Sequence, residues 1–132
     1  MKFPIIIIKN NAAPLYFFND ESEFGLVSKG GEKFYKNGTA YDSNGGRFLI
    51  NGIRSIERAP FLKSIKYFQP MYLADVKYDK ISENISLSDF KQLIIDHIYS
   101  HKKYWLARDT ADNLKNAILI KNRFTDIIIF FR

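Results

Sequence analysis

The chain contains no cysteine and no long apolar run, and each absence excludes a class of protein. Without cysteine there can be no disulfide, no thiolate-bound metal and no cysteine nucleophile. The N-terminal apolar run, Ile5–Ile8, falls short of the ~20 residues that cross a membrane and of the ~7–15 in a signal peptide. We therefore expect a cytoplasmic protein with no membrane partner.

Positive charge is in modest excess but is not concentrated. The chain has 20 basic and 14 acidic residues, and no basic run is longer than Lys102-Lys103. Nucleic-acid-binding surfaces usually cluster their charge on one face, so the spread favours a mixed, solvated surface. One alternative stays open, a small nucleic-acid-binding protein that uses basic residues and nearby tyrosines. Its candidate residues are Arg54, Arg58, Lys63 and Lys66.

The composition is that of an ordinary globular domain with many aromatic rings. Of the 132 residues, 46% are hydrophobic and 26% charged, with 12 Phe and 8 Tyr. This length fits one domain, and large rings bury much area each. We expect a single domain over residues 1–132, with one core and some exposed aromatic surface.

Strand patterns dominate the first half of the chain. Apolar, β-branched or aromatic runs at Phe3–Ile8 and Leu15–Phe18 predict buried strands. Three Asn-Gly pairs follow, and each can supply the positive φ of a tight hairpin turn. They predict a meander of strands at Lys33–Lys36, Thr39–Asp42, Arg47–Ile50 and Ile53–Arg58. One or two strands come after Pro60, with Pro70 at an edge or bend, and the run Ile127–Phe131 predicts a closing strand.

Helical periodicity marks the second half. Apolar residues and both histidines recur at spacings of three and four from Phe90 to His101, after a possible cap at Ser86 or Ser88. A second helix is predicted to begin at Thr110 and to end near Asn122. A short third helix, capped by Asn19 or Asp20 and ended by Gly30-Gly31, would bury Phe24 and Val27. Together these elements predict an α+β fold, an antiparallel sheet of about five to seven strands with two to three helices packed on one face.

Two segments have spacings that resemble metal sites. Asp42 and Asn44 match the first and third ligands of a calcium loop, but Ile53 stands where the twelfth position needs a carboxylate. His97 and His101 share one helix face, yet no third ligand is evident and the glutamate of a zinc hydrolase motif is absent. We expect a hairpin turn at Asp42, partly buried and hydrogen-bonded histidine rings, and neither metal nor cofactor.

Enzyme signatures are absent as well. The chain has no Gly-x-Ser-x-Gly elbow, phosphate loop or dinucleotide fingerprint. Asp75 and Asp79 are separated carboxylates, and nothing in the sequence sets one to be an acid and the other a base. We expect a protein that is not an enzyme, with no catalytic residues.

The best candidate for a partner-binding surface is the stretch YSHKKYWLAR, Tyr99–Arg108. It holds the only tryptophan, two tyrosines and three permanent positive charges, and Trp, Tyr and Arg are enriched in binding hot spots. The alternative is that Trp105 simply anchors the end of the helix in the core. The candidate partner-binding residues are Tyr99, Lys102, Lys103, Tyr104, Trp105 and Arg108.

The first half of the chain resembles a known group of proteins. The opening MKFPIIII and the later NGTAYDSNGGRFLI are similar to small bacterial immunity-type proteins encoded beside polymorphic toxins of contact-dependent or type VI systems. Those proteins open with an apolar strand and carry a Tyr/Phe-Asp-x-x-Gly-x-Leu-like hairpin near this position. The resemblance covers about the first 50 residues. It implies a cytoplasmic, non-catalytic protein that binds and blocks a cognate toxin, and the basic surface suggests an acidic patch on that toxin.

Overall fold

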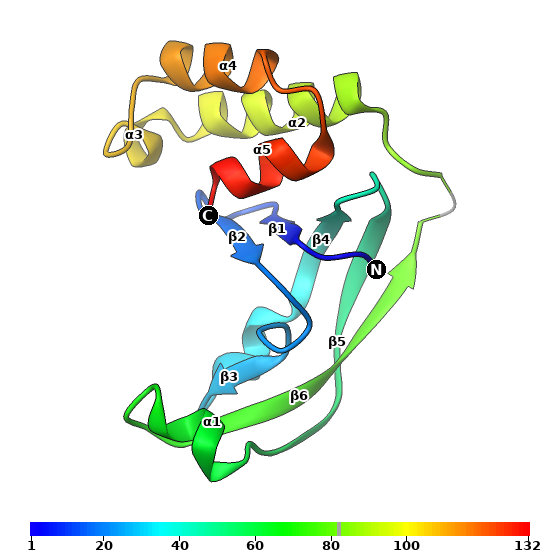
Figure 1. The fold of residues 1–132 in the computed structure, drawn as a ribbon, viewed down its shortest axis with the longest axis vertical. Coiled ribbons are helices and arrows are strands. Elements are labelled where there is room, and N and C mark those ends of the chain that lie inside the picture. The colour runs from blue at the N-terminus through cyan, green and yellow to red at the C-terminus, as the bar shows by residue number, and fades with distance from the viewer. Residues whose placement is uncertain (82) are drawn as a thin grey trace.

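In the computed structural model, which describes residues 1–81 and 83–132, a curled antiparallel sheet carries a layer of helices at one end (Figure 1). The sheet contains six strands in the order β2-β1-β4-β5-β6-β3. The strands are β1 (Ile5–Lys9), β2 (Leu15–Phe18), β3 (Leu26–Ser28), β4 (Lys36–Asp42), β5 (Arg47–Arg58) and β6 (Met71–Lys80). The predicted α+β class and antiparallel sheet are confirmed.

The helices fall into a long layer and two short pieces. The layer consists of α2 (Leu87–Ser100), α4 (Ala111–Leu119) and α5 (Phe124–Phe130), with α3 (Lys102–Trp105) at its corner. The 3₁₀ helix η1 (Gly31–Phe34) precedes β4, and α1 (Phe61–Ile65) lies between β5 and β6. In Figure 1, α1 lies at the far end of the sheet from the helical layer. No helix in the described ranges is long and apolar enough to cross a bilayer.

Strand β1 explains the four consecutive isoleucines. It pairs with β2 on one side and β4 on the other, so it is central to that part of the sheet. Ile6 and Ile8 belong to the core between the sheet and the helices, whereas Ile5 and Ile7 belong to a second core inside the curl. Successive strand residues point to opposite faces, so only an apolar run suits a strand buried on both.

The loop at Asp42 is a hairpin turn, as predicted. Asp42 is buried, and its Oδ1 accepts N–H groups from Asn44 at 2.9 Å and Gly46 at 2.7 Å. Its Oδ2 accepts the N–H of Lys2 at 3.0 Å. A carboxylate with these partners orders the turn and ties it to the N-terminal segment, because charge-assisted hydrogen bonds are among the stronger ones.

Only one of the three Asn-Gly pairs makes a hairpin turn. Gly45 has φ 81° in the β4–β5 turn. The pair at 51–52 lies at a register shift inside β5, where the strand continues instead of turning back. The two predicted strands Arg47–Ile50 and Ile53–Arg58 are therefore one strand. The pair at 37–38 likewise accompanies a register shift in β4. Positive φ serves β-bulges as well as hairpin turns, and sequence alone does not separate them.

The helix predicted for residues 19–30 is wrong. Residues 21–25 form turns, and Leu26–Ser28 pair with β6 as its outer neighbour. Gly25 has φ 92°, and a Cβ there would lie 2.5 Å from the Ala74 carbonyl oxygen. This close approach and the hydrogen bond from Ala74 N to Gly25 O end any helix and lead the chain onto the sheet edge. The strand predicted at Lys33–Lys36 is wrong for the most part, since η1 occupies residues 31–34.

The predicted closing strand is also wrong. The run at 127–131 lies mostly in helix α5, which buries Ile127 and Ile128 completely. The helices at 86–101 and 110–119 are confirmed, with Ser86 and Thr110 as N-caps that accept backbone N–H groups of Asp89 and Asn113. The second of these ends at Leu119, three residues before the predicted end at Asn122. Pro70 immediately precedes β6, which agrees with its predicted position at a bend.

Candidate functional site

The two histidines have the predicted structural role. His97 Nε2 lies 2.9 Å from the Ala13 carbonyl oxygen, and His101 Nδ1 lies 3.0 Å from the His97 carbonyl oxygen. Their ring centroids are 4.7 Å apart. Burial lowers the pKa of His97 below its ordinary value, and the bond to Ala13 only partly opposes this. Within residues 1–81 and 83–132, no three His, Asp or Glu side chains gather closely enough to share a metal ion.

The predicted surface at residues 99–108 forms a corner of the helical layer, and Trp105 faces inward there. Trp105 is 6% exposed and belongs to the core under the helices. Its ring meets Phe131 edge-on at 5.5 Å and Tyr104 at 5.3 Å. The buried indole Nε1 has no hydrogen-bond partner among the described residues. The anchoring role considered for Trp105 therefore matches its position, and the ring itself offers no surface to a partner.

The other corner residues remain outward. Lys102, Lys103 and Arg108 are exposed, as is half of Tyr104. Lys102 Nζ lies 5.0 Å from the centroid of the Tyr99 ring, and the guanidinium of Arg108 lies 4.4 Å from that of Phe130. Arg108 also donates a hydrogen bond to the carbonyl oxygen of Phe130. These contacts hold Lys102 and Arg108 against aromatic faces, which restricts the motion of both side chains before any partner binds.

Two carboxylates at the corner are occupied by internal partners. Asp109 accepts hydrogen bonds from Thr110 N at 2.7 Å and Asn113 Nδ2 at 2.9 Å, which lower its pKa. Asp112 accepts the hydroxyl hydrogen of Tyr99, and this bond raises the pKa of that phenol. The three cations have no such carboxylate partner at hydrogen-bond distance in the described parts of the chain. Neutral donors do not cancel the charge of the two carboxylates, so the corner presents three cations beside two anions and its balance is positive.

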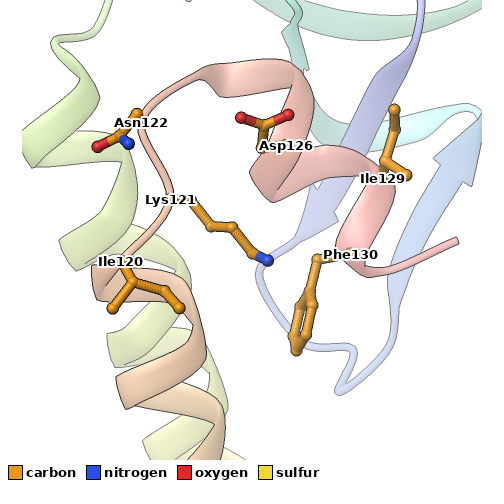
Figure 2. Close-up of a pocket in the computed structure, with 6 residues that line it drawn as sticks. All are labelled: Ile120, Lys121, Asn122, Asp126, Ile129 and Phe130. Atoms are coloured by element: carbon orange, nitrogen blue, oxygen red, sulfur yellow. The ribbon is translucent and has the colours of Figure 1, made fainter.

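A shallow hollow of about 380 Å³ lies where α4 leads into α5, and Figure 2 shows its six lining residues. Lys121 extends into it, with Nζ 5.3 Å from the centroid of Phe130. Asp126 lies on its rim, held by Arg123 at 2.9 Å, and that pairing lowers the pKa of Asp126. The hollow thus holds the ammonium of Lys121, the carboxylate of Asp126 that is paired with Arg123, and an apolar wall.

A second surface lies at the end of the β5–β6 hairpin, and the sequence analysis named its basic residues but not its exposed apolar ones. We call it the arm tip, meaning residues 58–71, which comprise α1 and its two connections. Phe68 is 96% exposed, Leu62 80% and Phe61 75%. The tip is closed by hydrogen bonds from Ala59 N to Met71 O at 2.9 Å and from Met71 N to Ser64 Oγ at 3.1 Å. A hollow of about 280 Å³ between Arg58 and Pro70 has mostly apolar walls.

A sequence signal for the arm tip was present. The stretch 58–71 has three basic residues, no acidic residue, and large apolar residues at 61, 62, 65 and 68. This spacing is helical, whereas one or two strands were predicted over residues 61–78. The prediction is correct for β6, which begins at Met71, and wrong for residues 61–65, which form α1. Three of the basic residues proposed for nucleic-acid binding, Arg58, Lys63 and Lys66, come together here. The fourth, Arg54, lies further along β5 and faces Asp75 at 4.0 Å.

The chain was compared with models of known protein families, with curated proteins and with solved structures, and none of the three comparisons found a match.

Proposed function

We propose that the protein is a non-catalytic binding protein, and specifically a cytoplasmic immunity protein that blocks a bacterial toxin by covering its surface. The observation that carries this proposal is the corner at residues 99–108. There the exposed side chains of Lys102, Lys103, Tyr104 and Arg108 surround a buried Trp105 that fixes their backbone. Interfaces gain affinity when aromatic and basic groups are already held in place.

The charge of the corner suggests the chemistry of its partner. Three cations point outward, whereas the carboxylates of Asp109 and Asp112 are engaged within the corner. A complementary toxin surface would be acidic, and such complementarity speeds encounter as well as fixing orientation. Blocking by occlusion needs only a matching surface and no chemistry, so this function is compatible with the hollows described above.

The decisive experiment measures binding to the toxin encoded by the neighbouring gene. The double variant Lys103→Ala, Tyr104→Ala should weaken binding by about 2 kcal/mol or more, roughly thirtyfold. The temperature of thermal unfolding should fall only slightly, through the loss of the Tyr104 contact with Trp105. Lys115→Ala removes an equally exposed lysine from α4 and serves as the control. Full affinity in the double variant would move the interface away from the corner, and no binding of wild type to that toxin would refute the function.

The alternative function, nucleic-acid binding, is tested by measuring the affinity of the protein for DNA and RNA. Submicromolar binding to generic DNA or RNA at about 150 mM salt would favour it, since weak non-specific contacts are lost steeply as salt rises. That binding should then depend on Arg54 and Lys66. Weak, salt-sensitive binding that is unchanged in Arg54→Ala and in Lys66→Ala would count against the nucleic-acid function.

A further inference from the structure

The arm tip contains the three most exposed of the large apolar side chains in the described part of the chain, Phe68, Leu62 and Phe61. Phe61, Leu62, Ile65 and Phe68 are 75%, 80%, 54% and 96% exposed. Phe61, Ile65 and Phe68 line one hollow, and Leu62 lies within α1 beside Phe61. Single exposed apolar residues are ordinary, but a cluster of this kind marks a contact surface. The tip is therefore shaped for something outside the folded chain.

The backbone at Phe68 gives a second, independent indication. Its φ is 55°, in the left-handed region that bulky residues rarely adopt. Asparagine or glycine would hold this turn with less strain, and the phenylalanine ring is almost entirely in solvent, where it stabilises nothing within the fold. A strained backbone that displays an aromatic ring points to a role in contact with another surface.

The charge of the tip narrows the choice of partner. Arg58, Lys63 and Lys66 lie within it and residues 58–71 contain no carboxylate. The nearest carboxylates come from another segment, since Asp20 and Glu23 line one hollow together with Leu62, Lys63 and Lys66. Three cations against these two carboxylates leave the tip with a positive balance. A second copy docking tip to tip would bring three cations against three, which is unfavourable. The partner must instead combine apolar material with negative charge.

The shape of the tip favours a lipid surface over a protein groove. Figure 1 shows α1 across the very end of the β5–β6 hairpin, remote from the helical layer. A protein partner would need a surface matched to this projecting end, whereas fluid lipid adapts to the shape of what enters it. Aromatic and aliphatic side chains enter the headgroup boundary, and lysine stems reach back to the phosphates.

We propose that the arm tip binds the surface of membranes that contain anionic phospholipids. Phe61, Leu62 and Phe68 enter the boundary between headgroups and acyl chains, while Arg58, Lys63 and Lys66 pair with the phosphates. The expectation of no membrane partner came from the lack of a spanning segment, and surface contact needs none. The inference does not depend on the toxin, because it concerns the opposite end of the molecule from the corner.

The test is co-sedimentation of the full chain with two kinds of vesicle, phosphatidylcholine alone and phosphatidylcholine mixed equally with phosphatidylglycerol. Binding should occur with the mixed vesicles and weaken as salt rises. Lys63→Glu, Lys66→Glu should reduce it by about 25-fold or more, since each basic residue near an anionic surface contributes about fivefold. Lys102→Glu, Lys103→Glu changes the net charge equally at the corner and should bind nearly as wild type does.

A second pair of variants tests the apolar part. Phe68→Asn should bind the mixed vesicles about tenfold or more weakly, because the ring no longer leaves water. It should unfold at no lower temperature, since asparagine tolerates positive φ. Ile120→Asn, at a site 74% exposed in the helical layer, is the matched control and should leave binding unchanged.

Several results would overturn the proposal. These are no binding to the mixed vesicles, equal binding to both kinds, or binding that both tip variants retain. Concentration-dependent self-association lost in Phe68→Asn would assign the tip to a second copy. Loss of toxin affinity in the tip variants, without vesicle binding in wild type, would assign it to a protein partner and leave the immunity function intact.

Discussion

His97 shows how one side chain links two distant parts of the fold. It lies on α2, and its ring bonds the carbonyl of Ala13 in the β1–β2 connection at 2.9 Å. Partial burial favours the neutral ring, and the nearby His101 also disfavours a charge there. The pKa of His97 is therefore lowered from the ordinary value of 6.5. The spacing in the sequence predicted which helix face His97 occupies, but the pKa of its ring depends on neighbours that the fold brings to it.

This environment predicts a pH effect on stability. When the folded pKa lies below the unfolded one, the unfolded chain binds more protons, so the free energy of unfolding falls as pH drops below about 6.5. Urea unfolding at about pH 7.5 and about pH 5.5 should show a smaller loss in His97→Gln than in wild type. Glutamine keeps an N–H donor for Ala13 and does not titrate. Equal losses in the two proteins would show that His97 is not a source of the acid sensitivity.

At the scale of elements, α5 shows how an apolar run depends on its surroundings. A short, wholly apolar run suits a buried strand or a buried helix, and periodicity does not separate them. Arg123 and the last residues of α4 turn the chain back over the sheet, where Ile6, Ile8 and Leu15 present an apolar face. A helix fills this space between α2 and the sheet. A strand would have placed 127 and 129 on one face, but Ile129 is 44% exposed.

Neighbouring isoleucines of α5 should therefore respond differently to truncation. Ile128→Ala should lower the free energy of unfolding by about 2–5 kcal/mol, because Ile128 is fully buried and its removal leaves a cavity. Ile129→Ala makes the same chemical change at a half-exposed site and should cost about 1 kcal/mol or less. Urea titrations of both variants provide the measurement. A larger loss for Ile129→Ala would indicate the strand pattern instead.

At the scale of the whole molecule, two cores share one strand, and the outer part of the β5–β6 hairpin extends beyond both. We call this part, from Arg54 to the arm tip, the arm. Strand β1 contributes Ile5 and Ile7 to the core within the curl, and Ile6 and Ile8 to the core beneath the helices. Beyond Ile53, five successive residues of β5, Arg54–Arg58, are exposed on both faces of the hairpin. The arm is thus held by its pairing with β6 and has few buried contacts of its own.

This arrangement predicts a gradient of local stability. Backbone amides in residues 54–58 should exchange with deuterium well before those of Ile5–Ile8, because regions with little apolar burial open without global unfolding. Hydrogen exchange followed by mass spectrometry would compare peptides from these two segments. The core peptide should exchange only with global unfolding. Equal protection of the two peptides would mean that the arm unfolds together with the two cores and is not a separate unit.

The sequence by itself determined those features whose causes lie within a few residues. Ser86 and Thr110 cap the helices that follow them, and Asn44-Gly45 makes its turn, because each hydrogen bond spans two to four positions. The sequence also indicated residues 99–108 as a candidate surface, because Trp, Tyr and basic residues are concentrated there. Tertiary structure alone decided that Leu26–Ser28 would pair with β6, more than forty residues later, rather than continue a helix. It likewise turned Trp105 inward and left Phe68 outside, because burial depends on which elements meet.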